Sequence, residues 1–183
     1  MRIISGQWRG RRLGAPKGDA TRPTADRTRE ALFSMLTSRL GSFEELSVMD
    51  LFAGSGALGL EALSRGAAHC LFVEQDRAAL DALRANVAAL CAGGAADIRA
   101  GSVMALGQAR RAYDVLLLDP PYGSGAGAVA LDKLQRQGWI APSAWIGLET
   151  AKNEPANAAD FIVESDRRIG KGRLTLLRPP PTS

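Results

Sequence analysis

The stretch "DLFAGSGALGLEAL", residues 50–63, carries an apolar run into a helical run through three glycines. Gly54, Gly56 and Gly59 have the spacing G-x-G-x-x-G, which lets the backbone turn tightly and approach a ligand closely. The N–H groups at the start of the following helix are then free to bind that ligand. Sites for NAD, FAD and S-adenosylmethionine share this spacing, so the stretch predicts a nucleotide-type ligand at the end of a strand.

Strands and helices are expected to alternate around this turn, a pattern typical of a parallel sheet with helices on both faces. A helix capped by Thr24 and ended by Gly41 comes first. Strands are expected at 47–53, 69–75, 96–102, 113–119 and 144–150, with helices at 57–66, 77–94 and 127–138. Residues 161–169 and 173–179 predict a closing antiparallel hairpin. The fold class is therefore α/β, a Rossmann-like, mostly parallel seven-stranded sheet.

The bulk composition suits a soluble protein with one main core. The chain has 183 residues, of which 46% are hydrophobic and 23% charged, as in ordinary globular proteins. No apolar run approaches the roughly 18 residues of a membrane helix, so a cytoplasmic monomer without a membrane partner is expected. Cys70 and Cys91 lack metal-ligand spacing, which predicts buried free thiols and no metal site.

Positive charge is concentrated at the N-terminus. Residues 1–29 hold eight basic and two acidic residues, a net charge of +6, whereas the remaining 154 residues have a net charge of −2. Such an arm on a near-neutral body is typical of proteins that bind a polyanion, although a solvated tail is the alternative. Trp8 and nearby glycines indicate a small β-hairpin. We expect a basic arm at 1–22, a catalytic domain at 23–178 and a disordered tail at 179–183.

Two acidic residues near the glycine turn narrow the choice of ligand. Glu74 ends its strand 20 residues after Gly54, where an acidic residue usually binds a ribose. Asp50, four residues before the first glycine, would repel a pyrophosphate but suits a ligand with an α-amino group and a sulfonium. S-adenosylmethionine is such a ligand. Ser102 and Val103 end the third strand, where its adenine would lie.

The second informative stretch is "YDVLLLDPPYGSG", residues 113–125, in which a buried strand runs into Asp119 and two prolines. Ligands bind at the carboxyl ends of parallel strands. The carboxylate of Asp119 and the backbone carbonyl of Pro120 can both accept hydrogen bonds from an exocyclic amine and expose its lone pair. Tyr122 offers a ring on which an extruded base can stack. The stretch predicts methylation of an amine.

The order of the glycine turn, "VEQD" (73–76) and "DPPY" (119–122) resembles the class I S-adenosylmethionine-dependent amino-methyltransferases. The N-terminal "RIISGQWRGRRL" (2–13) and "TRPTADRTREALFSML" (21–36) are similar to the RsmD-type 16S ribosomal RNA guanine-N2-methyltransferases. This resemblance covers nearly the whole chain. It implies methylation of guanine 966 of 16S rRNA in an assembled or partly assembled small ribosomal subunit.

The expected site residues fall into three sets. The catalytic set is Asp119, Pro120, Pro121 and Tyr122. The cofactor-binding set is Asp50, Phe52, Gly54, Ser55, Gly56, Glu74, Gln75, Ser102, Val103 and Asp119. The RNA-binding set is Arg2, Trp8, Arg9, Arg11, Arg12, Arg22 and Arg27.

Three other functions remain open from the sequence. An adenine-N6-methyltransferase acting on DNA or RNA would use the same tetrapeptide, because Asp119 suits adenine N6 and guanine N2 equally well. A DNA enzyme of this kind usually has an added target-recognition segment, for which the chain has little room. A NAD-dependent oxidoreductase could use the glycine turn and Glu74, but His69 stands at the wrong end of its strand. A non-catalytic RNA-binding module would leave the DPPY tetrapeptide unexplained.

Overall fold

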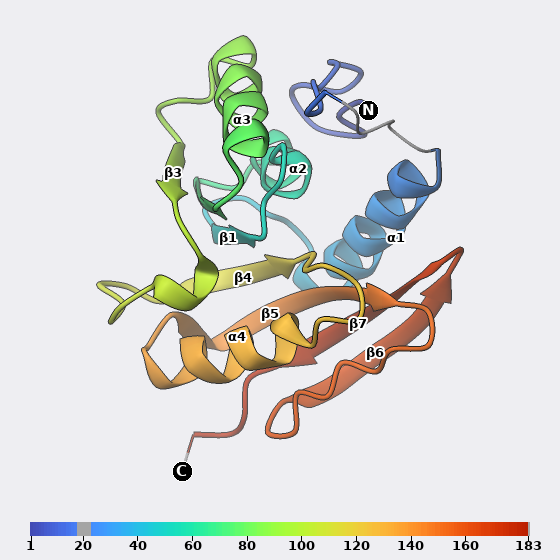
Figure 1. Ribbon diagram of the computed structural model, residues 1–183, viewed down its shortest axis with the longest axis vertical. Coiled ribbons are helices and arrows are strands. Elements are labelled where there is room, and N and C mark those ends of the chain that lie inside the picture. Colours follow the sequence, from blue (N-terminus) through green and yellow to red (C-terminus); the bar gives the residue numbers. More distant parts are fainter. Residues whose placement is uncertain (18–22, 183) are drawn as a thin grey trace.

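The computed structural model describes residues 1–17 and 23–182. Their strands form one seven-stranded sheet in the order β3-β2-β1-β4-β5-β7-β6 (Figure 1). The strands are β1 (Ser47–Leu51), β2 (His69–Glu74), β3 (Ala96–Ala100), β4 (Tyr113–Leu118), β5 (Ile140–Ala151), β6 (Ile162–Ile169) and β7 (Gly172–Arg178). Strands β1 to β5 pair in parallel, whereas β7 is antiparallel to both β5 and β6. The predicted α/β fold class with its closing hairpin is confirmed.

Helices cover both faces of the sheet, and each face has its own hydrophobic core. They are α1 (Pro23–Leu40), α2 (Ala57–Ser64), α3 (Arg77–Ala89), α4 (Ala126–Arg136) and the short 3-10 helix η1 (Val103–Ala105). Helices α1, α2 and α3 pack on one face, over strand residues such as Val48 and Leu117. Helix α4 and η1 pack on the other face, over residues such as Leu116 and Leu148. Alternate strand residues therefore enter different cores.

Some boundaries differ from the sequence prediction. Helix α1 begins at Pro23 rather than after Thr24. Helix α3 ends at Ala89, five residues early, because Cys91 turns the chain with φ 53°. That turn leaves Cys91 exposed, so the prediction of two buried thiols is wrong for Cys91 and right for Cys70, which lies in β2.

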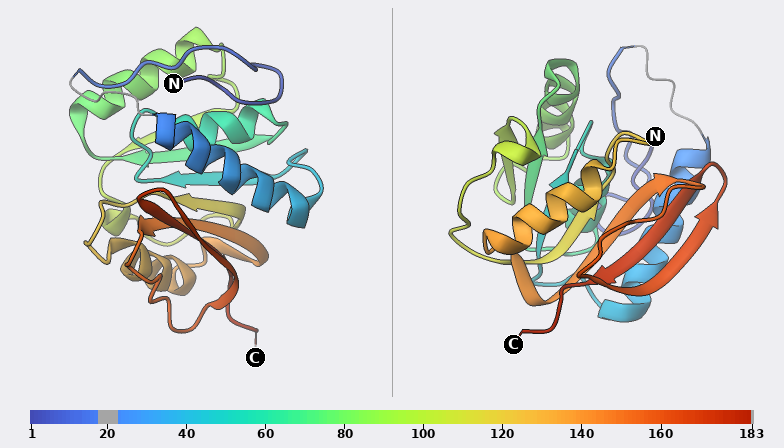
Figure 2. Two further views of the ribbon diagram at one scale, coloured as in Figure 1. Left: turned by 90° about the vertical axis from the view of Figure 1, so that its right-hand side faces the viewer. Right: turned by 60° about the horizontal axis from the view of Figure 1, so that its bottom comes forward.

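The N-terminal arm has the shape of a hairpin but pairs through one isolated bridge, Arg2 with Arg12. It lies along α2 and α3 (Figure 2), with Ile3 and Leu13 buried. The carboxylate of Glu61, a fully buried side chain of α2, accepts hydrogen bonds from the arm's backbone N–H groups at positions 4 and 5, at 2.9 and 3.0 Å. The arm is therefore packed into the body of the protein.

The order of the parallel strands reverses between β1 and β4. In doubly wound sheets, ligands bind outside the carboxyl ends of the strands at such a reversal.

At the C-terminal side of the sheet, residues 179–182 form no helix or strand, and Pro179 is buried. Among the described residues, none of the helices is long and apolar enough to cross a membrane.

Candidate active site

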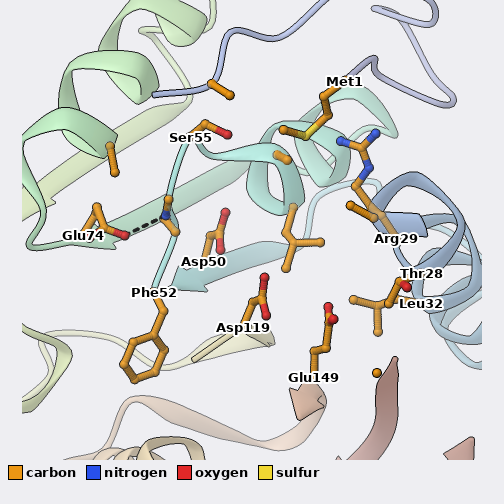
Figure 3. Close-up of a pocket in the computed structure, with 18 of the residues that line it drawn as sticks. Met1, Thr28, Arg29, Leu32, Asp50, Phe52, Ser55, Glu74, Asp119 and Glu149 are labelled. Carbon is orange, nitrogen blue, oxygen red and sulfur yellow. Dashed lines mark hydrogen bonds between the residues drawn. The ribbon is translucent and has the colours of Figure 1, made fainter. Parts of the chain in front are cut away.

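A cavity of about 790 Å³ opens at the carboxyl ends of β1, β2, β4 and β5 (Figure 3), within the usual size range of small-molecule sites. Its walls come from the arm, α1, the glycine turn, four strand ends and the start of β7. The residues that line it include Met1, Arg29, Asp50, Phe52, Gly54, Ser55, Glu74, Asp119, Tyr122, Glu149, Lys171 and Gly172. The cavity therefore joins the glycine turn to the DPPY tetrapeptide.

The glycine turn forms one wall of this cavity. Gly54 has φ 57°, and a Cβ placed on it would meet no atom within 4 Å, so the backbone is open toward a ligand. A Cβ on Gly56, which has φ 86°, would instead lie 2.3 Å from Leu83 Cδ1, so a larger residue would be strained and would have to displace Leu83. Phe52, also at a positive φ of 60°, is a strained non-glycine residue in the same wall. Of the predicted residues of this turn, Phe52, Gly54 and Ser55 thus line the cavity, whereas Gly56 does not.

Glu74 is fixed by three backbone donors. Its Oε2 accepts from the N–H of Gly54 at 2.7 Å, and its Oε1 accepts from the N–H groups of Gln75 and Asp76, both at 2.8 Å. An ionised carboxylate has roughly four lone-pair positions. One position therefore remains for a hydroxyl group of a ligand in the cavity, as the ribose prediction requires.

Asp50 is a buried carboxylate with one of its two oxygens hydrogen-bonded to another described residue. Its Oδ2 accepts from the N–H of Gly59 at 2.8 Å and so fixes the start of α2. Among the described residues, none donates to its Oδ1. Burial raises the pKa of Asp50 well above its usual range, and the charges of Asp119 and Glu74 add to the effect. A cationic ligand would relieve this cost, because opposite charge favours the ionised form.

Asp119 follows β4 and faces the cavity beside Asp50 (Figure 3). It is accessible to solvent through the cavity, although protein surrounds it on most sides. Burial, followed by the charge of Glu149, raises the pKa of Asp119 to about 7. The carbonyl of Pro121 accepts from the Ser124 hydroxyl at 2.6 Å, whereas hydrogen bonds within the described residues leave the carbonyl of Pro120 unused. Within the described residues the Pro120 carbonyl thus keeps its hydrogen-bonding capacity, although Pro120 itself is buried outside the cavity lining.

Glu149 is a site residue that the sequence reasoning missed. It follows the buried residues Ile146, Gly147 and Leu148 of β5 and points into the cavity next to Asp119 (Figure 3). Tyr122 donates its hydroxyl to Glu149 Oε1 at 2.7 Å, and its ring is 50% exposed. The sequence does contain a pattern that indicates this role. In "AWIGLET" (144–150) an acidic residue follows an apolar strand, as Asp119 does in "YDVLLLD" (113–119).

Several predicted site residues do not line the cavity. Gln75 is exposed, and Ser102 accepts from the N–H of Met104 at 3.1 Å and so caps η1, with Val103 buried behind it. Pro120 is buried and Pro121 exposed outside the lining. A role in binding adenine or in catalysis remains a prediction for these residues.

The predicted RNA-binding residues have different environments. Arg2 and Arg11 donate to the carbonyls of Gly10 and Ala89, at 2.9 and 2.7 Å, and so brace the arm. Trp8 is half-buried against the core. All five described arginines of this set, Arg2, Arg9, Arg11, Arg12 and Arg27, are exposed. Arg22 lies outside the described residues.

Arg29 is a second cavity residue that the sequence reasoning did not assign to the site. The guanidinium of this buried residue of α1 donates to the Arg2 carbonyl and to Asp26 Oδ1. Burial lowers its pKa, and within the described part of the chain its Nε and Nη1 have no partner. Arg29 thus connects the arm, α1 and the cavity wall.

The sheet order, glycine turn and cavity at the strand reversal define the Rossmann-like fold of class I methyltransferases. A solved structure with 35% sequence identity, "Putative methyltransferase yhhF from Escherichia coli", superposes with a TM-score of 0.85 over 100% of this chain and 99% of that one. A family model described as "Conserved hypothetical protein 95" matches residues 1–178. The chain belongs to this family, the RsmD family.

Curated relatives agree with this assignment. Ribosomal RNA small subunit methyltransferase D of Escherichia coli (strain K12) is 41% identical over 173 residues, which are 93% of this chain and 86% of that protein. The protein of the same name from Haemophilus influenzae is 38% identical over 159 residues, 85% of this chain and 81% of its own length. The family resemblance stated from the motifs is confirmed.

Proposed function

We propose that this protein transfers a methyl group from S-adenosylmethionine to the exocyclic N2 amine of a guanine in 16S rRNA, guanine 966 by family resemblance. The reaction would take place in the cytoplasm on the small ribosomal subunit or an assembly intermediate, and the enzyme would act as a monomer. The observation that carries the proposal is Asp119, an acceptor in the same cavity as Glu74 and Asp50. The names of the family relatives support an rRNA substrate.

The residues in the cavity fit the proposed cofactor. The spare lone pair of Glu74 would accept a ribose hydroxyl, and the unpaired Oδ1 of Asp50 would face its positive charge. Bound S-adenosylmethionine would supply a methyl group on a positively charged sulfur. The open backbone at Gly54 would let the cofactor approach the turn closely.

The substrate amine would be positioned by the residues after β4. The Asp119 carboxylate accepts one N–H bond of the amine, and the Pro120 carbonyl accepts the other. With both hydrogens directed toward acceptors, the nitrogen lone pair points away from them. The exposed ring of Tyr122 offers a face on which the base can stack. A pKa near 7 also suits Asp119 to take up the proton that the amine loses.

The proposal is tested by offering the protein three methyl acceptors with labelled cofactor: unmethylated 30S particles, protein-free 16S rRNA and duplex DNA, at matched salt. We expect 30S particles to accept label fastest, because an arm this short cannot select one guanine in a long RNA by itself. Mass spectrometry of rRNA from a deletion strain should show loss of one N2-methylguanine. Labelled duplex DNA or N6-methyladenine would favour the adenine alternative instead.

Glu74→Ala should weaken the binding of S-adenosylhomocysteine by about 1–3 kcal/mol, the usual cost of losing a charged hydrogen bond. Titration calorimetry measures this, and Glu164→Ala on exposed β6 is a control with the same loss of charge. Glu74 also fixes the Gly54 turn, so thermal unfolding of the unliganded variant separates local loosening from lost ligand contact. Unchanged affinity would remove Glu74 from the site.

The double substitution Arg9→Gln and Arg12→Gln should raise the KM for 30S particles without changing cofactor affinity, because both side chains are exposed in the arm, away from the cavity lining. Each lost phosphate contact should flatten the log–log salt dependence of RNA binding by about 0.7–0.9. The matched control is Arg110→Gln with Arg136→Gln, an equal charge change outside the arm. A salt dependence equal to that of the wild type would contradict RNA binding by the arm.

A further inference from the structure

Glu149 and Asp119 occupy equivalent positions at the ends of neighbouring parallel strands. Leu118 of β4 is in register with Leu148 of β5, so the next residues, Asp119 and Glu149, follow side by side. Paired strands lie about 4.8 Å apart. Both carboxylates leave the sheet on the face that α1 covers and point into one cavity (Figure 3).

The Glu149 carboxylate is held in one orientation. Its Oε1 accepts from the Tyr122 hydroxyl at 2.7 Å. A Cβ placed on Gly172 would lie 3.1 Å from that oxygen and 3.2 Å from the Tyr122 hydroxyl, so β7 packs closely behind the pair. Burial raises the pKa of Glu149, whereas the Tyr122 hydrogen bond opposes this rise and favours the ionised form. The ionised form can only accept hydrogen bonds.

Two adjacent acceptors match guanine better than adenine. In guanine, the N2 amine lies next to N1–H, so the base presents donors side by side on its Watson–Crick edge. In adenine, the N6 amine lies next to N1, which carries no hydrogen and is itself an acceptor. An ionised carboxylate beside the amine therefore accepts a hydrogen bond from N1–H of guanine and is repelled by the N1 lone pair of adenine.

We propose that Glu149 selects guanine over adenine by accepting a hydrogen bond from N1–H of the base whose amine lies at Asp119. This inference rests on the proposed function, and it names the residue that distinguishes two substrates that Asp119 treats alike. Tyr122 acts as a positioning residue for Glu149 in addition to offering its ring for stacking. A polar site built this way discriminates strongly, because its buried acceptor is left unpaired by the wrong base.

The test uses 2-aminopurine, which has the same amine at C2 as guanine but no hydrogen on N1. Particles of 30S are reconstituted around 16S rRNA in which a ligated synthetic segment carries either guanine or 2-aminopurine at the position that the wild type methylates. The ratio of kcat/KM for guanine to kcat/KM for 2-aminopurine is measured for each enzyme. For the wild type we expect a ratio of about 10²-fold or more, since the unpaired carboxylate penalises 2-aminopurine.

Glu149→Gln should lower this ratio by about tenfold or more, because the amide N–H can donate to the unprotonated N1 of 2-aminopurine. Glu164→Gln is the control with the same chemical change on an exposed strand and should leave the ratio unchanged. Tyr122→Phe should move the ratio in the same direction by a smaller factor, and it serves as the second variant if Glu149→Gln unfolds.

An unchanged ratio in both Glu149→Gln and Tyr122→Phe would overturn the inference, even if overall activity falls, because a merely structural role lowers both rates together. Wild-type activity of Glu149→Gln on guanine would overturn it as well. Failure of the wild-type enzyme to methylate guanine in 30S particles would instead contradict the proposed function. The two failures are thus distinguishable.

Discussion

Asp119→Ala is expected to lose turnover by about 10²–10⁴-fold, the range for removal of a group that handles a proton in the transition state. The physical reason is that the substrate amine would lose the carboxylate that accepts from it at the end of β4. Cofactor binding should change little, since Asp119 is one predicted cofactor contact among several and Glu74, Asp50 and the glycine turn remain in the variant. Single-turnover rates on 30S particles measure the first effect, and calorimetry with S-adenosylhomocysteine measures the second.

Asp119→Asn sharpens this test, because the amide oxygen still accepts a hydrogen bond but the side chain cannot take up a proton. Its activity should fall less than that of Asp119→Ala. Asp160→Ala, which removes an exposed carboxylate outside the site, should behave as the wild type. Near-native kcat in Asp119→Ala would refute the proposed role of the tetrapeptide.

The same residue predicts the pH dependence. Burial and Glu149 raise the pKa of Asp119 to about 7, so the carboxyl group is protonated below this value and ionised above it. Only the ionised form accepts with both oxygens, so kcat/KM should fall as the pH is lowered through about 7. Asp119 and Glu149 interact, and the midpoint therefore belongs to the pair. In Asp119→Asn, the fall of kcat/KM at low pH should disappear or move to another pH.

Glu61→Ala is expected to destabilise the protein by about 3–5 kcal/mol, the usual cost of breaking a buried ion pair on one side. Glu61 is fully buried, and besides two backbone N–H groups of the arm its Oε1 accepts from Arg65 Nε at 3.0 Å. Removing the carboxylate leaves three part-buried donors without their acceptor. Urea unfolding measures the loss, and the arm should become sensitive to proteolysis near Ile4.

Asp132→Ala is the matched control, because Asp132 and Arg136 form a helical pair with the same four-residue spacing on the exposed surface of α4. Such exposed pairs contribute about 0.3–0.5 kcal/mol. A loss below about 1 kcal/mol in Glu61→Ala would show that the arm does not depend on this contact. Deleting the whole arm would remove two of the three donors to the Glu61 carboxylate and leave only Arg65.

The sequence predicted those parts of the site that depend on neighbouring residues. A strand followed by a glycine turn, or by Asp119 and two prolines, places its polar residues at a strand end whatever the rest of the chain does. The acidic residue 20 positions after Gly54 follows from the length of one helix and one strand. These features, and the order of strands and helices, are local patterns with a fixed geometric result.

The missed parts depend on contacts between distant segments. Glu149 became a site residue because β5 pairs with β4 in a register that the sequence does not display. No role was predicted for Glu61, because the arm residues that donate to its carboxylate, Ile4 and Ser5, are distant in the sequence. The charge of the basic arm could not separate Arg12 from Arg11, whose guanidinium donates to the Ala89 carbonyl, because both side chains are exposed.

The closing hairpin has a consequence for how the protein is made. Met1 and Gly172 line the same cavity, so its walls are incomplete until the ribosome has synthesised β7, the last strand. Before that point, β5 has an unpaired edge that can pair with another chain, and the parallel pairs of high sequence separation form slowly. A ligand of this cavity can stabilise only a chain that already includes β7. A growing chain must therefore be protected from aggregation without help from such a ligand until β7 has been synthesised.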